Sequence, residues 1–404
     1  MKKNAKSVRS IHPFPARMAP DLAFKKLQRL SHGKVVLDPM AGSGTVLRQA
    51  MDLGLRARGF DLDPLAVLMS KVWTTSVRDS AIENCLSKVL KAARSLRSSS
   101  ISLPWIDGSA ETKAFVNYWF AQPQRCDLRK LSYVLMKVCA GNSDRNVAAM
   151  NVLKVAFSRL IITKDNGASL ARDVSHSRPH KVAEVSSYKV MPEFVRSVNH
   201  LRNQLRAMPP KGECKVQRGD ARALKRVKDK SVDVVMTSPP YLNAIDYMRG
   251  HRLSLVWLGY SMSDLRRIRS DSIGAERGPE TKESRSEFEE IKEAMGKISK
   301  LPNRHKQMIS RYAHDIKSMM SEIARVLHPR GRAILVVGNS CLKNVFVRNA
   351  DGIVKAGSQV GLRLLARTER DLPDTKRYLP MPVQRRKALG KRMRTEAILT
   401  FGVQ

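Results

Sequence analysis

A short apolar segment that ends in an acid and leads into a glycine-rich turn constrains the fold most. Residues 34–38 read KVVLD, and the turn continues as DPMAGSGT over 38–45. A helical pattern follows over 46–53 and stops at Gly54, before a second strand-like segment that ends at Asp61. A strand, a glycine turn, a helix and a strand ending in an acid form the first half of a doubly wound α/β domain.

The α/β pattern is interrupted and then resumes. From about 75 to 211 the periodicity is helical, which predicts a large helical insertion. Strand-like segments return at 214–218, 232–237 and 333–337, and residues 362–365 and 397–401 could supply two closing strands. We therefore expect five parts. The first half of the core is 1–74, the helical insertion is 75–211 and the catalytic half of the core is 212–260. A charged helical insertion at 261–310 is a candidate for target recognition, and 311–404 is the C-terminal part of the core, which opens with an amphipathic helix at 312–327 and a turn at 329–331.

The net charge indicates a polyanionic partner. Lys and Arg number 74 against 36 Asp and Glu, so the formal net charge is +38. Such an excess is typical of proteins that bind nucleic acid. Its densest runs are 266–269 and 363–394.

Cysteine usage and hydropathy indicate a cytoplasmic protein, nucleoid-associated if it binds DNA. The five cysteines (Cys85, Cys126, Cys139, Cys214, Cys341) show no CxxC spacing, which predicts buried thiols in a reducing compartment. No apolar stretch follows the basic N-terminus, and no apolar run approaches the ~20 residues that span a bilayer. We expect neither a signal peptide nor a membrane partner.

The glycine turn indicates which ligand the first half of the core binds. A dinucleotide fingerprint would need a third glycine where Leu47 stands, and there is no GxxxxGK[ST] sequence. A loop with Gly42 and Gly44 and no phosphate-binding apparatus suits a ligand whose adenosine carries no phosphate, and S-adenosylmethionine is the obvious candidate. Asp61 has the position at which a carboxylate meets ribose hydroxyls in nucleotide-binding α/β units. The alternative is a glycine turn that serves packing alone.

A second turn, Thr237-Ser-Pro-Pro-Tyr241, follows the strand-like segment 232–237. Two prolines stiffen the turn and remove two backbone donors, a hydroxyl precedes them and an aromatic ring follows. This is a plausible pocket for a planar ring that carries an amino group. Taken alone, the turn could equally be a strand stop.

Together these motifs resemble those of the amino-group DNA methyltransferases, which methylate N4 of cytosine or N6 of adenine. The match rests on D-P-x-A-G-S-G-T at 38–45, S-P-P-Y at 238–241 and His12-Pro-Phe-Pro-Ala-Arg-Met18, and it covers about half of the chain. It implies a Rossmann-like, S-adenosylmethionine-dependent methyltransferase fold with a mostly parallel seven-stranded sheet. The cofactor segments precede the catalytic loop, so the arrangement is not the permuted one.

The resemblance also implies the site residues. The cofactor-binding residues would be His12, Pro13, Phe14, Asp38, Ala41, Gly42, Gly44, Thr45, Asp61, Asp220 and Thr237. Among them, the segment at His12 would close over the cofactor's methionine end and Asp220 would meet its adenine. The catalytic residues would be Ser238, Pro239, Pro240 and Tyr241. The segment after the loop resembles a cytosine-N4 subgroup and supplies candidate nucleic-acid contacts at Asn243, Tyr247, Arg249 and Arg252.

The mechanism follows from the chemistry of the target. The lone pair of an exocyclic amine is delocalised into the base, so the amine is a poor nucleophile. The Ser238 hydroxyl and the Pro239 carbonyl can each accept an N–H and localise that lone pair, while Tyr241 stacks on a base flipped out of double-stranded DNA. Serine before Pro-Pro favours cytosine N4, with adenine N6 as the alternative. Attack at cytosine carbon-5 is disfavoured, because no cysteine follows a proline.

Alternatives remain for the polar segment 175–180 and for the chain as a whole. His176 and His180 lie four apart, but Pro179 breaks the helix that would align them, so we expect no metal there. We prefer a loop at the rim of the site with Arg178 on a phosphate; an inert loop is the alternative. Residues 115–120 are expected to be core. The chain could instead be an RNA exocyclic-amine methyltransferase or a catalytically silent nucleic-acid-binding module, and a DNA methyltransferase could work with a cognate restriction endonuclease.

Overall fold

The computed structural model describes residues 11–14, 18–97, 100–138, 144–163, 166–172, 179–242, 246–275, 286–343, 345–371 and 395–404, without the side chains of 138 and 144–146. A seven-stranded sheet has the order β10-β11-β7-β6-β1-β2-β5. These strands are β1 (Val35–Asp38), β2 (Arg56–Asp61), β5 (Cys214–Arg218), β6 (Val232–Thr237), β7 (Leu327–Gly338), β10 (Leu362–Asp371) and β11 (Thr395–Val403). Neighbouring strands from β5 to β7 are parallel, and β11 is antiparallel to both β7 and β10. The predicted α/β fold with a mostly parallel seven-stranded sheet is confirmed.

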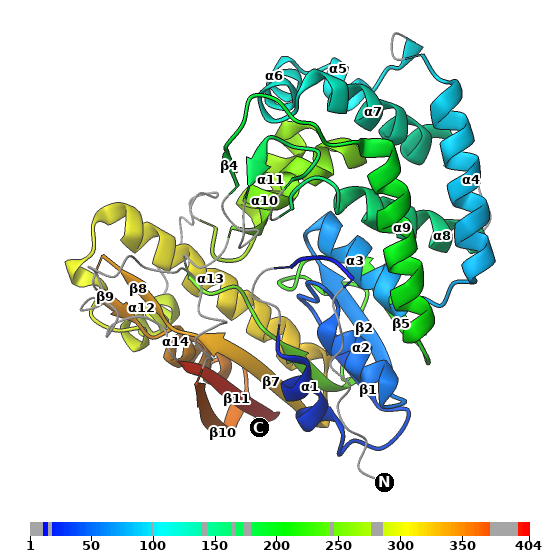
Figure 1. Cartoon of the computed structure of the whole chain (residues 1–404). Coiled ribbons are helices and arrows are strands. Elements are labelled where there is room, and N and C mark those ends of the chain that lie inside the picture. The colour runs from blue at the N-terminus through cyan, green and yellow to red at the C-terminus, as the bar shows by residue number, and fades with distance from the viewer. Residues whose placement is uncertain are drawn as a thin grey trace.

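Alternate residues of the central strands face two different hydrophobic clusters. Leu37 and Val235 belong to one cluster, and their neighbours Val36 and Val234 belong to the other. Because side chains alternate along a strand, both faces of the sheet are buried, which explains why β1 is apolar up to its final Asp38. On one face lie α1 (Pro20–Leu27) and α2 (Thr45–Asp52); on the other lie α12 (Ser286–Ala294), α13 (Asn303–Val326) and α14 (Asn349–Ser358) (Figure 1).

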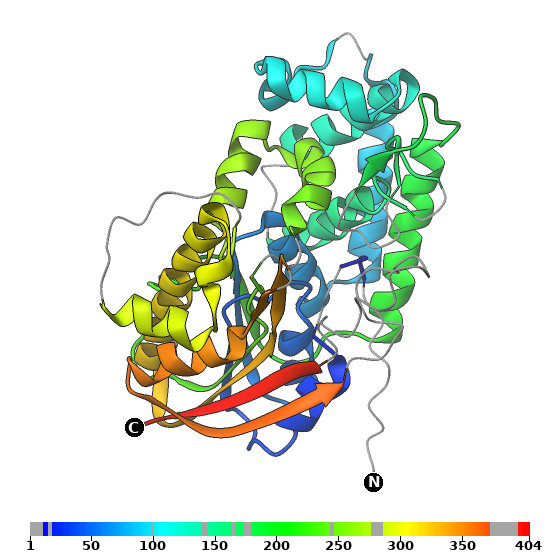
Figure 2. The ribbon, with the colours of Figure 1, turned by 90° about the vertical axis from the view of Figure 1, so that its left-hand side faces the viewer.

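A second lobe is helical and lies over the carboxyl end of the sheet (Figures 1 and 2). It contains α4 (Asp79–Ser95), α5 (Pro104–Asp107), α6 (Ala110–Trp119), α7 (Gln122–Tyr133), a π-helical turn (Val134–Val138), α8 (Asp144–Ser158) and α9 (Val190–Ala207). The short strands β3 (Ala171–Arg172) and β4 (His180–Lys181) pair within it. One hydrophobic cluster joins this helical lobe to α3 (Pro64–Thr74) of the core.

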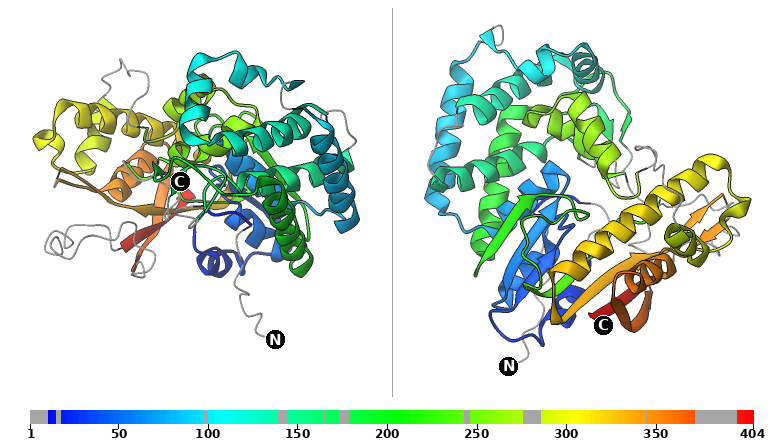
Figure 3. Two further views of the ribbon diagram at one scale, coloured as in Figure 1. Left: turned by 45° about the horizontal axis from the view of Figure 1, so that its top comes forward. Right: turned by 180° about the vertical axis from the view of Figure 1, so that it is seen from behind.

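The segment after the catalytic loop also belongs to the helical lobe. Helix α10 (Tyr247–Leu255), a 3₁₀ turn (Val256–Leu258) and α11 (Met262–Asp271) share its cluster. The indole of Trp105 donates a 2.8 Å hydrogen bond to the carbonyl of Val256. The expected unit 261–310 is thus divided: α11 packs in the helical lobe, whereas α12 packs against α13 and α14 in the cluster on one face of the sheet (Figure 3).

Several expected features differ in extent. Helix α13 begins at Asn303, nine residues before the expected start, and the expected turn at 329–331 lies within β7. Residues 329–331 lie where the β6–β7 register shifts: Val232 pairs with Leu327 but Val234 pairs with Arg332, so β7 carries extra residues between these pairs. The hairpin of β8 (Ser340–Leu342) and β9 (Val345–Val347) was not expected.

Two predictions about burial are partly wrong. The thiol of Cys85 is buried, but Cys126 and Cys214 are half-buried and Cys341 is exposed because it lies on the small β8–β9 hairpin outside the main sheet; Cys139 lies outside the described residues. Of the aromatic group at 115–120, Trp119 and Phe120 are core, whereas Tyr118 is 54% exposed. No described helix is long and apolar enough to cross a bilayer.

Candidate active site

The carboxyl ends of three adjacent strands bring the two sequence motifs together. Strand β1 ends at Asp38, β2 at Asp61 and β6 at Thr237. The hydroxyl of Thr237 donates a 2.7 Å hydrogen bond to Oδ1 of Asp38, which also accepts the backbone N–H of Met40 at 3.1 Å. The first residue of the glycine turn is therefore bonded to the residue that precedes the Ser-Pro-Pro-Tyr turn.

The glycine turn is held against the second acid. The backbone N–H of Gly42 donates to Oδ2 of Asp61 at 2.8 Å, and the Ser70 hydroxyl donates to the Gly42 carbonyl at 2.8 Å. Gly42 has φ +51°, and a Cβ there would lie 3.1 Å from the Phe14 ring. A side chain at this position would be strained and would push Phe14 away, so the close approach requires glycine.

The N-terminal segment 11–14 lies over this turn. The ring of Phe14 stacks on Tyr247 with centroids 5.1 Å apart, and its centroid is 5.5 Å from that of His251. The guanidinium of Arg159, from the helical lobe, donates a 2.6 Å hydrogen bond to the carbonyl of Ile11. The segment 11–14 thus connects the glycine turn to the helical lobe.

Burial controls the ionisation of the acids at the strand ends. Burial raises the pKa of Asp38 to about 7, against smaller opposing hydrogen bonds from Thr237 and Met40. Burial, followed by the charge of Asp63, raises the pKa of Asp61 to about 7. Burial also acts on Asp63, but His251 and backbone donors outweigh it and hold the pKa of Asp63 below its ordinary value. Asp38 and Asp61 are therefore readily protonated, whereas Asp63 is ionised.

The Ser-Pro-Pro-Tyr turn is fixed from three other elements. The Ser238 hydroxyl donates to the carbonyl of Val336 in β7 at 3.0 Å. The hydroxyl of Tyr312 in α13 donates to the Pro240 carbonyl at 3.3 Å, and the Tyr241 hydroxyl donates to Oε1 of Glu396 in β11 at 3.2 Å.

The environment of Tyr241 keeps its hydroxyl protonated. Burial, and then the charge of Glu396, raise the pKa of Tyr241 well above its ordinary value, against a smaller effect of the Ser238 hydroxyl. Glu396 also pairs with Arg370 at 2.8 Å. The phenol is therefore a neutral donor, and its ring is anchored to the strand pair at the edge of the sheet.

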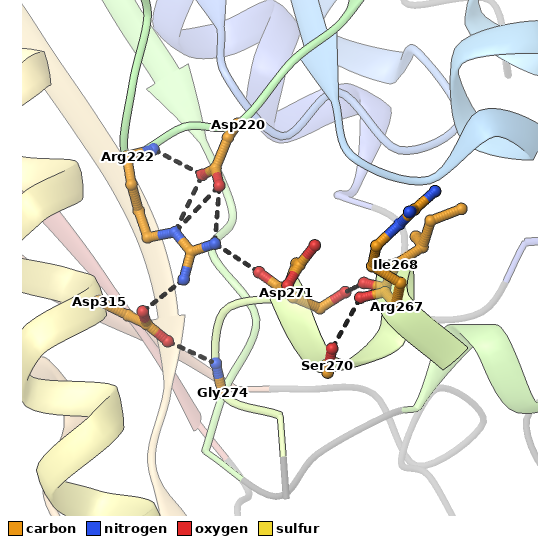
Figure 4. Close-up of polar contacts among 9 residues, drawn as sticks. Asp220, Arg222, Arg267, Ile268, Ser270, Asp271, Gly274 and Asp315 are labelled. Atoms are coloured by element: carbon orange, nitrogen blue, oxygen red, sulfur yellow. Dashed lines mark hydrogen bonds and ion pairs between the residues drawn. The ribbon is translucent and has the colours of Figure 1, made fainter. Parts of the chain in front are cut away.

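Asp220, expected at the adenine, lies in a bridged network (Figure 4). Arg222 contacts both oxygens of Asp220, the closer at 2.7 Å, and reaches Asp315 of α13 at 2.6 Å. It also donates to the carbonyl of Asp271 at 2.5 Å, and Asp315 accepts the N–H of Gly274 at 3.4 Å. The loop after β5 is thereby joined to α13 and to the end of α11. Asp220 also accepts the backbone N–H of Arg222 at 2.8 Å, so Arg222 engages both of its oxygens.

The expected nucleic-acid contacts that the structure describes lie in two places, around Asp246 and against Phe14. Arg249 lies 3.6 Å from the carboxylate of Asp246, which also pairs with Arg269 at 2.7 Å. The guanidinium of Arg252 lies 5.3 Å from the centroid of Phe115, and its pKa is lowered by burial and then by the charge of Arg269. Three cations therefore share one acid beside the catalytic loop. Of the other expected contacts, Tyr247 stacks on Phe14, and Asn243 and Arg178 lie outside the described residues.

Five residues near the site were not predicted. Asp63 carries a detectable signal, since an Asp-Pro pair is typical of a helix start and its side chain caps α3 by accepting the N–H of Leu65. His251, Arg222, Arg269 and Glu396 carry no such signal, because their partners are distant in sequence. Within the described residues, no group of three His, Cys, Asp or Glu side chains could hold a metal ion.

The curated proteins that this chain is similar to are type II methyltransferases. The chain is 24% identical over 372 residues to the type II methyltransferase M.MvaI of Kocuria varians, which covers 83% of this chain and 78% of the relative. It is 23% identical over 293 residues to the type II methyltransferase M.BsoBI of Geobacillus stearothermophilus, covering 65% of this chain and 54% of that protein. A segment of 72 residues is 36% identical to M.MjaII of Methanocaldococcus jannaschii, covering 18% of this chain and 14% of that methyltransferase. No protein-family profile matches the chain.

Solved structures that align with the chain include a geranyl diphosphate methyltransferase in complex with GPP and sinefungin. It is 6% identical, covers 95% of this chain and 76% of its own, and has a TM-score of 0.36. The predicted resemblance to methyltransferases is confirmed by the curated relatives. Neither their names nor the alignments distinguish cytosine N4 from adenine N6.

Proposed function

We propose that this chain, a relative of type II methyltransferases, is an S-adenosylmethionine-dependent DNA methyltransferase acting on the exocyclic amino group of a base, cytosine N4 in preference to adenine N6. The observation that carries the proposal is the hydrogen bond between Thr237 and Asp38. It places a turn suited to an adenosine cofactor next to a turn suited to an amino-bearing base. Two substrates of a direct transfer need such adjacency.

The residues at the strand ends suit the cofactor. Gly42 and Gly44 let the turn pack closely, because a Cβ would lie 3.1 Å from the Phe14 ring at Gly42 and 3.0 Å from the Ser70 hydroxyl at Gly44. Asp61, bonded to the N–H of Gly42, offers a carboxylate to ribose hydroxyls. When bound, S-adenosylmethionine supplies a methyl group on a positively charged sulfur, which needs no metal and no covalent enzyme intermediate.

Ser238 would activate the amine as an acceptor. Its hydroxyl proton is donated to the Val336 carbonyl, so its lone pairs remain for an N–H of the target amine. That hydrogen bond and one to the Pro239 carbonyl would pull the nitrogen toward tetrahedral geometry and localise its lone pair for attack on the methyl carbon. The new N–C bond would form as the bond between the methyl carbon and sulfur breaks, and the methylated amine would then release one proton to water.

Tyr241 would hold the base by stacking. Its hydroxyl is bonded to Glu396, which fixes the ring without engaging the ring face. The base must leave the DNA helix to reach this ring, and stacking on an aromatic side chain offsets part of the cost of unpairing.

DNA binding would use the cations beside the loop. Arg249, Arg252 and Arg269 gather around one acid, and like charges in one place favour a phosphate group between them. The net charge of +38, summed over the whole chain, also favours binding to DNA. The helical lobe, which lies over the carboxyl end of the sheet, and the unit 261–310 are the candidates for reading the target sequence.

The biological setting is part of the proposal. The enzyme would act in the cytoplasm on double-stranded DNA, alone or with a cognate restriction endonuclease. An RNA exocyclic-amine methyltransferase and a catalytically silent nucleic-acid-binding module are the competing functions.

One assay separates these functions. Purified protein is incubated with DNA or RNA and with cofactor carrying a labelled methyl group, and the nucleic acid is digested to nucleosides. We expect label in N4-methylcytosine from DNA. Label in N6-methyladenine would correct the base, label on RNA alone would favour the RNA enzyme, and cofactor binding without transfer would favour the silent module.

A further inference from the structure

His251 is a buried histidine with one ring nitrogen engaged and the other not. The side chain is on α10 and the residue is only 5% exposed. Its Nδ1 contacts Oδ2 of Asp63. Its Nε2 is buried and has no hydrogen-bond partner among the described residues. A buried polar atom without a partner is destabilising, so it calls for a ligand or water.

Asp63 determines which nitrogen is open. An ionised carboxylate can only accept, so Nδ1 of His251 carries the proton and donates it to Asp63. This contact holds the other ring nitrogen, Nε2, in a fixed direction. Asp63 is itself fixed, because its other oxygen accepts the N–H of Leu65 at the start of α3. The pair therefore presents a preoriented ring nitrogen that can form one more hydrogen bond.

The surroundings of His251 are those of the candidate cofactor pocket. Its ring lies 5.5 Å from that of Phe14, which covers Gly42. Asp61, the acid bonded to Gly42, is close enough for His251 to affect its ionisation. Helix α10 contacts α3, so the histidine sits where the helical lobe meets the glycine turn.

We propose that Nε2 of His251 forms a hydrogen bond with a polar group of the bound cofactor, either a ribose hydroxyl or the methionine amino-acid group, and that Asp63 is the residue that positions it. This inference rests on the proposed function, because it needs the cofactor to bind at the glycine turn. It adds a cofactor-binding residue from beyond the catalytic loop. Cofactor binding would then join α10, with its arginines, to the core.

Calorimetric titration of the full chain tests the proposal. The ligands are S-adenosylhomocysteine, which has the ribose and the amino-acid group, and 5′-methylthioadenosine, which has only the ribose. His251→Phe keeps an aromatic ring beside Phe14 and removes Nε2. His251→Gln places an amide near the position of Nε2. His314→Phe, on α13 beside Phe288 and outside the pocket, is the matched control.

We expect His251→Phe to melt within a few degrees of wild type yet to bind S-adenosylhomocysteine at least tenfold more weakly, with partial recovery in His251→Gln and no change in His314→Phe. An equal loss for 5′-methylthioadenosine identifies the ribose as the partner of His251; an unchanged affinity for it identifies the amino-acid group. If wild type binds the cofactor and a folded His251→Phe binds it equally well, the inference is overturned while the proposed function stands. If wild type binds neither ligand, the proposed function itself fails.

Discussion

The hydroxyl of Thr237 donates a 2.7 Å hydrogen bond to the carboxylate of Asp38, although the two residues lie 199 positions apart. Both residues are buried, and each immediately precedes a turn of the candidate site. Their strands are parallel neighbours, so their carboxyl ends meet at one edge of the sheet. This bond couples the geometry of the cofactor turn to that of the catalytic turn.

Removing the Thr237 hydroxyl should destabilise the protein. In Thr237→Val the buried Asp38 loses a donor, which should lower the free energy of unfolding by about 1–3 kcal/mol. Thr237→Ser keeps the hydroxyl and should cost less. Urea unfolding measures both variants, and equal stability of the Val and Ser variants would contradict the coupling.

Replacing Ser238 should impair transfer and spare cofactor binding. Ser238→Ala removes an acceptor for the target amine, and loss of one such group typically costs on the order of 10²-fold in rate.

Tyr241→Phe keeps the stacking ring and loses only the bond to Glu396, so its rate should fall less than that of Tyr241→Ala. Labelled methyl transfer gives the rates, and calorimetry gives the cofactor affinity. A fully active Ser238→Ala would remove serine from the mechanism.

Stability without cofactor should depend on pH through two buried acids. Burial raises the pKa of Asp38 and Asp61 to about 7 from an ordinary value of 3.8. Between these values the folded chain binds more protons than the unfolded chain, so this contribution is complete below about pH 4 and is lost as the pH rises through 7. Asp38→Asn and Asp61→Asn should each flatten the decline. Melting temperatures from pH 5 to 8.5 test this, and variants with the wild-type slope would refute it.

Breaking the Arg222 bridge should separate the loop after β5 from α13. Arg222→Met leaves Asp220 and Asp315 without their shared cation, and since the group is partly exposed we expect a loss of about 2–3 kcal/mol. Arg222→Lys keeps the charge but not the planar fork and should recover only part of the loss. Urea unfolding reports the effect. A Met variant as stable as wild type would show that the bridge is not needed for folding.

The arginines beside the loop should contribute to DNA affinity. Arg249→Ala and Arg269→Ala should each weaken binding to any sequence and reduce the salt dependence by about one phosphate contact. Arg56→Ala, which removes an exposed cation at the start of β2, at the opposite end of the strands, is the matched control and should change little. Fluorescence anisotropy at several salt concentrations measures both quantities. An unchanged salt slope in both variants would place the DNA elsewhere.

The sequence by itself determined the core of the fold and the two turns. Apolar runs at 34–38 and 232–237 predict buried strands because both faces of a central strand need apolar side chains, and glycine and proline mark turns through local backbone restrictions. These are short-range effects, so they can be found in a sequence. The strand at 214–218 was also predicted with the observed bounds, although it is an edge strand in which only Val216 is buried.

The tertiary structure decided which distant residues meet. The pairings of His251 with Asp63, of Arg222 with Asp315 and of Tyr241 with Glu396 cross 188, 93 and 155 positions, and no local pattern marks them. It also divided the charged unit 261–310, because α11 buries its apolar side chains in the helical lobe, whereas α12 packs against α13 and α14. Burial is a property of the packed molecule, so the raised pKa values of Asp38 and Asp61 emerged only there. The sequence supplied the chemical groups, and packing set their partners and their charge.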